Sequence, residues 1–176
     1  MTISPAIRRL VRERAQRCCE FCGVSETDTA GLLTIDHYQP ISKAGTDHYD
    51  NLLYCCAQCN LHKQNYWPKK TTDLFLWNPR FEPANKYFLL LDNGRLHPLT
   101  PVGDFTIKRL RLNRPQLIDY RLHKRQEAEA VRLLEQYQKL MILINQINMQ
   151  ALRLVDEQTE LLLLQQELIR LLTANK

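Results

Sequence analysis

The chain has 176 residues, of which 44% are hydrophobic, enough for one compact domain with an appendage or for two small domains. Its net charge of +5 is uneven: residues 1–124 contain 18 Lys and Arg against 12 Asp and Glu, whereas residues 125–176 contain 6 against 7. A basic surplus on one part of a chain fits a polyanionic partner such as nucleic acid. The sequence has neither a run of 18 apolar residues nor a secretory signal at its start, which predicts a cytoplasmic protein without a membrane span.

The first 66 residues combine short elements with turns. Ser4 is a hydroxyl N-cap in front of Pro5, a pair that typically begins a helix. Period-two apolar runs and turn residues indicate the strands and loops that follow. The elements expected in chain order are a helix over residues 5–17, a strand over 32–37, a loop over 39–50, a strand over 51–55 and a turn leading into a helix over 56–65.

Residues 67–124 form a second region with strand and turn signals. Strands are expected over residues 74–77 and 87–91, and Asp92-Asn93-Gly94 indicates a hairpin turn after the second of them. A helix is expected to begin within residues 106–112, with a helix boundary at Asn113-Arg114-Pro115. This region is therefore predicted to be a small α+β extension.

The rest of the chain, from about residue 116, contains only helix-forming sequence. Seam residues from Leu133 to Leu172 recur in steps of three and four, with Gln158 and Gln165 at two of the seam positions. A heptad seam of this length is typical of a coiled coil or a helical hairpin, and polar seam residues can set its register. The sequence leaves open whether the seam pairs within one chain or across a homodimer.

Four of the six cysteines form two Cys-x-x-Cys pairs, Cys19/Cys22 and Cys56/Cys59. Each pair can place two thiolates on one metal ion, and two pairs complete a tetrahedral zinc site. In a reducing compartment, such cysteines are better explained as metal ligands than as disulfides. Cys18 and Cys55, which precede the two pairs, are interpreted as packing thiols, although a shifted register that uses either of them remains open.

Polar residues lie between and beside the cysteine pairs, and together with them they resemble the HNH endonuclease family, the ββα-metal nucleases. The resemblance covers about residues 17–65. It depends on these motifs: Cys19-Glu-Phe-Cys22, Thr34-Ile35-Asp36-His37, Pro40, Gly45, Asp50-Asn51-Leu52 and Cys56-Ala-Gln-Cys59-Asn60-Leu-His-Lys63. Residues 74–121 are more loosely similar to an extension found in bacterial, notably cyanobacterial, HNH proteins.

The resemblance implies hydrolysis of DNA phosphodiesters that leaves 3′-hydroxyl and 5′-phosphate ends. His37 is expected to be the general base, and Asn51 is expected to orient its imidazole. Asp36 and Asn60 offer oxygen ligands to one catalytic divalent ion, Mg²⁺ or Mn²⁺, whereas the zinc is structural. Because neighbouring strand residues point to opposite faces, Asp36 and His37 need an irregular strand end to act on one phosphate.

Several basic residues are candidate phosphate contacts, with solvated surface as the equal alternative. They are Lys43, Lys63, Arg8 and Arg12. The rival interpretation of the whole chain is a catalytically inactive zinc module that binds nucleic acid or a protein partner, and an RNA-directed nuclease is a weaker alternative.

The sequence thus predicts an α+β protein with a small ββα-metal core braced by zinc knuckles and long C-terminal helices. The expected domains are a nuclease core over residues 1–66, an α+β extension over 67–124 and a C-terminal helical or coiled-coil segment over 125–176. DNA is the expected partner.

Overall fold

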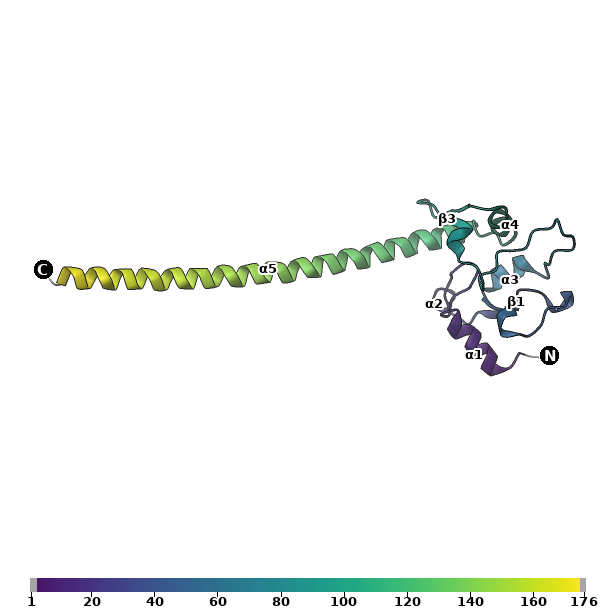
Figure 1. Ribbon diagram of the computed structural model, residues 1–176, viewed down its shortest axis with the longest axis horizontal. Helices are drawn as coiled ribbons and strands as arrows, with labels where there is room; N and C mark the ends of the chain where they lie inside the picture. Colours follow the sequence, from purple (N-terminus) through teal and green to yellow (C-terminus); the bar gives the residue numbers. More distant parts are fainter. Residues whose placement is uncertain (1–2, 175–176) are drawn as a thin grey trace. The chain divides into compact units, whose positions relative to one another are not determined.

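The computed structural model describes residues 3–174 and has a mixed α+β fold with two small strand pairs (Figure 1). Its α-helices are α1 (Pro5–Arg14), α2 (Glu26–Thr29), α3 (Ala57–Lys63), α4 (Pro101–Arg109) and α5 (Pro115–Ala174). Its strands are β1 (Thr34–His37), β2 (Leu52–Cys55), β3 (Phe88–Leu90) and β4 (Leu96–Pro98). Three short 3-10 helices complete it: η1 (Ile41–Lys43), η2 (Tyr49–Asn51) and η3 (Ala84–Lys86).

The helix α1 begins where the sequence predicts it, with the Ser4 hydroxyl accepting a hydrogen bond from the Ile7 amide. It ends at Arg14, before the predicted end, because Gln16 and Arg17 adopt positive φ angles of 51° and 59°. The chain thereby leaves the helical conformation and enters the first cysteine turn.

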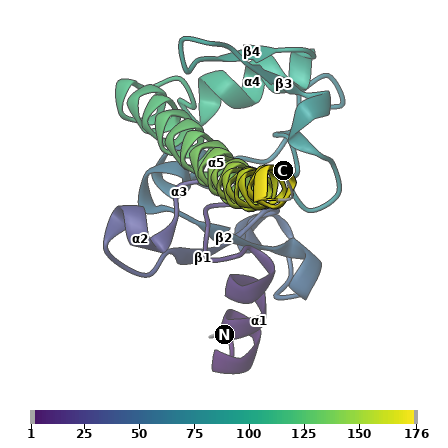
Figure 2. The same cartoon turned by 90° about the vertical axis from the view of Figure 1, so that its left-hand side faces the viewer.

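The antiparallel pair β1–β2 joins two hydrophobic cores. Residues of β2 alternate between its faces, so that Leu53 and Cys55 belong to one core while Leu52 and Tyr54 belong to the other, which also contains Val11 of α1. Figure 2 shows α1 below this strand pair and α4 beside the second pair, β3–β4.

The first core contains residues from both sides of residue 66, so the extension packs directly against the cysteine-bearing segment. It includes Phe21 and Leu53 from the N-terminal part and Trp77, Phe88 and Leu110 from the extension. Contacts within the chain divide it into two compact units, Met1–Lys124 and Arg125–Lys176.

Within the extension, the hairpin predicted around Asp92-Asn93-Gly94 is present as β3–β4. The strand predicted over residues 74–77 is wrong. This segment is irregular because the Trp77 amide donates to Oγ1 of Thr106 over 2.8 Å, so a side chain of α4 takes the place of a neighbouring strand. The helix α4 begins earlier than expected, at Pro101 after the Thr100 N-cap.

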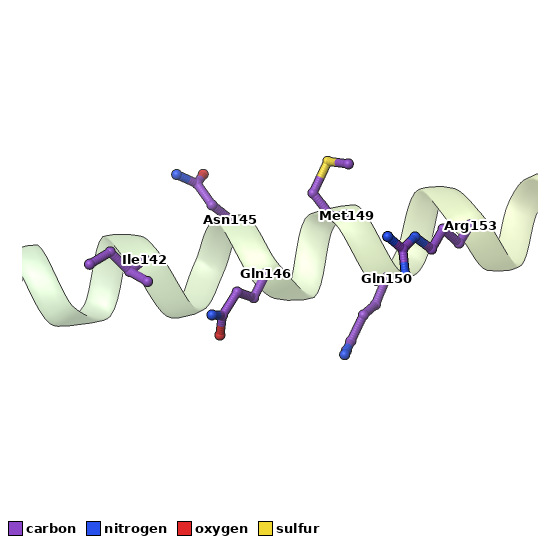
Figure 3. Close-up of a pocket in the computed structure, with 6 residues that line it drawn as sticks. All are labelled: Ile142, Asn145, Gln146, Met149, Gln150 and Arg153. Atoms are coloured by element: carbon purple, nitrogen blue, oxygen red, sulfur yellow. The ribbon is translucent and has the colours of Figure 1, made fainter.

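The C-terminal segment is a single 60-residue helix, α5, so the helical-hairpin alternative does not apply. Its large apolar side chains between Val131 and Leu171 are between 39% and 62% exposed; the side chain of Leu172 lies outside the described residues. Figure 3 shows six side chains, from Ile142 to Arg153, that project in different directions from this one helix. Ligand sites are generally concave and enclosed by several elements, so this part of α5 is ordinary helix surface. Among the described residues, no helix is long and apolar enough to cross a membrane.

Candidate functional site

Two turns bring four cysteine thiols together. In the first turn, the Cys19 amide donates to the Val24 carbonyl and the Gly23 amide donates to the Cys19 carbonyl, each over 2.8 Å. In the second, Cys56 is the N-cap of α3, and its sulfur accepts a hydrogen bond from the Cys59 amide. The sulfur atoms of Cys19, Cys22, Cys56 and Cys59 all lie within 4.8 Å of one another.

This spacing fits a tetrahedral metal ion. Zinc–sulfur bonds of about 2.3 Å place two tetrahedral ligands roughly 3.8 Å apart, and the Cys22 and Cys56 sulfurs are 3.7 Å apart. Hydrogen bonds among the thiols lower the pKa of Cys19 and raise the pKa values of Cys22 and Cys59, so a metal ion would have to displace thiol protons when it binds. The chain therefore has a four-cysteine site of the type that binds zinc.

The two remaining cysteines are outside this group, as their interpretation as packing thiols requires. Cys18 donates to the Gln16 carbonyl over 3.4 Å. Cys55 is buried, and a hydrogen bond with Cys19 together with burial raises its pKa, which favours the neutral thiol. The thiols that cluster are therefore those of the two Cys-x-x-Cys pairs.

Asp36 and His37 end the strand β1, opposite Leu53 and Leu52 of β2. Oδ1 of Asp36 accepts a hydrogen bond from the His37 amide over 2.9 Å. The strand pairing stays regular through His37, so the irregular strand end that the sequence led us to expect is not seen in the register.

Lys63, at the end of α3, holds this strand end from the other side. Its ammonium nitrogen lies 2.9 Å from Oδ2 of Asp36 and donates to the His37 carbonyl over 2.6 Å. Its side chain is only 1% exposed, so the phosphate contact considered for Lys63 is incompatible with its position. Buried ammonium groups need charged or carbonyl partners, and Asp36 and His37 supply them.

Asn60 lies three positions before Lys63 on α3 and is partly buried. Residues three apart on a helix share a face, so Asn60 lies on the same face of α3 as Lys63, whose ammonium group contacts Asp36. Because Asn60 directly follows Cys59, the cysteine site fixes the start of the helix that carries it.

The donor set at this strand end fits a hard cation. The two oxygens of the Asp36 carboxylate face the His37 amide and, over 2.9 Å, the Lys63 ammonium. Hard divalent cations prefer oxygen ligands, so this carboxylate and the Asn60 amide oxygen are chemically suited to such an ion.

Asp47 contacts the imidazole of His37, a relationship that sequence reasoning missed. Nε2 of His37 lies 2.7 Å from Oδ1 of Asp47, and both side chains are only partly exposed. Asp47 comes from the irregular loop between the strands, where no periodicity marks it. The only sequence signal was an acidic residue ten positions after a candidate base.

Asn51 was expected to orient the imidazole, but its described hydrogen bonds hold the loop instead. Its Oδ1 accepts from the Gln39 amide over 2.8 Å, and its Nδ2 donates to the carbonyls of Gln39 and Thr46. Gly45 allows this loop to close, because a Cβ there would lie 1.9 Å from the Gln39 carbonyl oxygen. Asn51 thus braces the loop that presents Asp47.

The other basic residues considered for phosphate contact have different surroundings. Arg12 forms two short hydrogen bonds with Glu26, at 2.5 and 2.6 Å, and this arginine lowers the pKa of Glu26 to about 2. Arg12 is therefore largely engaged within the protein. Lys43 and Arg8 are exposed, and Arg8 donates to the Ile3 carbonyl.

In a comparison with protein families, residues 19–66 match the model of the HNH endonuclease family. Comparisons with curated proteins and with solved structures found no match. The matched segment begins at the first thiol ligand, includes β1, β2 and α3, and ends three residues after Lys63. Residues 19–66 are therefore an HNH endonuclease family domain built around a four-cysteine metal site.

Proposed function

We propose that the protein is a metal-dependent DNA endonuclease that hydrolyses phosphodiester bonds with His37 as the general base. The observation that carries this proposal is the convergence of Asp36, His37 and α3 beside the four thiols of an HNH family domain. Nuclease-type chemistry is what this family generally performs. The inactive nucleic-acid-binding module is the alternative that the experiment below must exclude.

Zinc is the proposed occupant of the four-cysteine site, with a structural role. The four thiols provide a complete tetrahedral ligand set, which leaves no position for substrate. The metal would hold the first turn to the start of α3 and so fix the helix that carries Asn60 and Lys63.

Asp36 and Asn60 would hold the catalytic ion, Mg²⁺ or Mn²⁺. When bound, such an ion stabilises negative charge on the phosphoryl group and the leaving oxygen. Asp36 contributes a carboxylate, an oxygen ligand of the kind that hard divalent cations prefer. Lys63 keeps this carboxylate at the strand end by contacting it and the next peptide carbonyl together.

His37 would take a proton from the attacking water. A carboxylate accepts hydrogen bonds only, so the contact with Asp47 assigns the proton of a neutral imidazole to Nε2. Nδ1 is then the nitrogen with a free lone pair. Asp47 would also stabilise the imidazolium formed after proton transfer, as the orienting group does in other base-assisted reactions.

We further propose that two chains pair through α5 in parallel. The seam consists of two alternating sets of positions, each of which repeats every seven residues. Gln158 and Gln165 belong to one set, and the other set, from Leu133 to Leu168, is apolar throughout. In a parallel, in-register pair each glutamine meets its own copy and can share hydrogen bonds, whereas an antiparallel pair places it against apolar residues. A parallel pair gives both chains the same direction, so that two nuclease domains could act on one duplex.

Plasmid nicking with Mg²⁺ or Mn²⁺ tests the activity. Zinc-loaded parent protein should cut, and His37→Ala should reduce the rate by about 10²–10⁴-fold, the usual contribution of a general base. His48→Ala is the matched control, because this exposed histidine lies in the same loop region. Retained cutting by His37→Ala would remove the assigned base, and an inactive, well-folded parent on DNA and RNA would favour the binding module.

A further inference from the structure

A hollow of about 530 Å³ combines residues of the HNH domain, including three that directly follow Lys63, with residues of the extension. Its lining includes three basic residues, two aromatic residues and one acid: Lys43, Lys69, Arg109, Tyr66, Trp67 and Asp73. Lys69, Arg109, Trp67 and Asp73 lie outside the matched HNH segment. We call this hollow the basic groove.

The positive charges of the basic groove outnumber its one acid, Asp73. Oδ2 of Asp73 accepts hydrogen bonds from the amides of Lys70 and Lys69 over 3.0 and 2.9 Å. These hydrogen bonds and the charge of Lys69 lower the pKa of Asp73, so it stays charged and offsets one of the three positive charges. The groove keeps a net positive charge, and Lys43 and Lys69 are exposed to an external anion.

Arg109 is held in a fixed position on the wall of this groove. Its guanidinium carbon lies 5.0 Å from the centre of the Tyr66 ring, and its Nη2 donates to the Lys63 carbonyl over 3.2 Å. A guanidinium stacked on an aromatic ring keeps its remaining donors in one plane, a geometry suited to phosphate oxygens.

Two residues that line the basic groove, Arg109 and Trp67, contact residues next to the candidate catalytic strand end. On one side, Arg109 contacts the carbonyl of Lys63, whose ammonium group contacts Asp36. On the other, the ring of Trp67 packs edge to face against Tyr38, the residue after His37, with ring centres 5.8 Å apart.

Lys43 is connected to the same region through Gln39. The Gln39 side chain donates to the Lys43 carbonyl over 2.7 Å, and the Gln39 backbone is held by Asn51. Hydrogen bonds therefore connect the Lys43 side of the groove to the loop that presents Asp47.

We propose that the basic groove binds the phosphate backbone of duplex DNA next to the bond that is cut, which gives the extension a role in substrate binding. Lys43, Lys69 and Arg109 provide the phosphate contacts, and contacts of this kind position a duplex without reading its sequence. This inference rests on the proposed function, since it takes DNA to be the substrate.

The test measures the affinity for a fluorescent duplex by anisotropy between 50 and 200 mM salt, in the zinc-loaded His37→Ala background to avoid cutting. The variant Lys43→Ala/Lys69→Ala removes two exposed charges. Lys86→Ala/Lys108→Ala is the control, because it removes the same charge from two exposed lysines outside the groove. Unchanged zinc content and melting temperature establish that each variant folds.

Each lost phosphate contact lowers the slope of log affinity against log salt by about 0.9. Across this fourfold salt range, the groove variant should therefore lose about twelvefold less affinity than its parent, while the control should match its parent. An unchanged slope in the groove variant, or an equal change in the control, would overturn the proposal. If protein with His37 intact binds duplex DNA through the groove but does not cut it, the endonuclease activity is contradicted and DNA binding by the groove is supported.

Discussion

Nε2 of His37 and Oδ1 of Asp47 lie 2.7 Å apart, which joins the end of β1 to a loop residue ten positions later. The loop itself is held by Asn51, which bonds to the backbone of Gln39 and Thr46. Asp47 therefore contacts the imidazole directly, whereas Asn51 supports the loop that carries Asp47.

Replacing Asp47 by Asn should slow nicking while leaving the fold intact. The amide can still occupy the site, but it loses the negative charge that stabilises the imidazolium and that selects the Nε2–H tautomer. We expect at least about a tenfold fall in kcat, smaller than the loss from removing the base itself. The measurement is the nicking rate at saturating plasmid.

Asp50→Asn serves as the control for this prediction, because Asp50 is an exposed acid in the same loop region whose side chain is 50% exposed. Equal rates for Asp47→Asn and the parent protein would contradict the orienting role of Asp47.

Lys63→Met should destabilise the domain strongly. The substitution keeps an apolar stem but leaves the Asp36 carboxylate and the His37 carbonyl without the ammonium that contacts both. Removing one partner of a buried ion pair typically lowers the free energy of unfolding by about 3–5 kcal/mol. Urea denaturation of zinc-loaded protein measures the change.

Lys43→Met provides the comparison at an exposed lysine, where the change should stay within about 0.5 kcal/mol. The double variant Asp36→Asn/Lys63→Met should recover part of the lost stability, because it removes the unpaired charge. Parent-like stability of Lys63→Met alone would show that the ion pair contributes little.

Metal binding should depend on four of the six cysteines. Cys59→Ser should lose the bound zinc and the helix α3, because the metal holds the N-terminal turn of that helix. Cys18→Ala and Cys55→Ala should each keep about one equivalent of zinc. Elemental analysis and circular dichroism provide the two readouts, and loss of zinc from Cys55→Ala with retention in Cys59→Ser would reverse the ligand assignment.

The exposed apolar seam of α5 should make the protein dimeric. Light scattering should give about twice the chain mass of 20.8 kDa. Leu154→Glu/Leu161→Glu introduces charges at two seam positions that are about 60% exposed in the single chain, and it should shift the mass to that of one chain.

Thr159→Glu/Gln166→Glu adds the same charge away from the seam and should remain dimeric. A parent protein that stays monomeric at micromolar concentration would contradict pairing through α5.

Local patterns in the sequence were sufficient for several parts of this protein. The spacing of Cys19/Cys22 and Cys56/Cys59 predicts the metal cluster, because each pair spans one tight turn. The Ser4-Pro5 pair and the Asp92-Asn93-Gly94 turn predict a helix start and a hairpin, since capping and turn formation depend on residues a few positions apart.

Tertiary structure alone decided the contacts between distant segments. Whether Lys63 is a surface lysine or a buried one depends on His37, 26 positions earlier, and no periodicity connects the two. In the same way, Arg109 reaches Lys63 over 46 positions because the extension shares a core with the HNH segment. Local propensity acts over a few residues, whereas burial and ion pairing are set by whichever segments the hydrophobic core brings together.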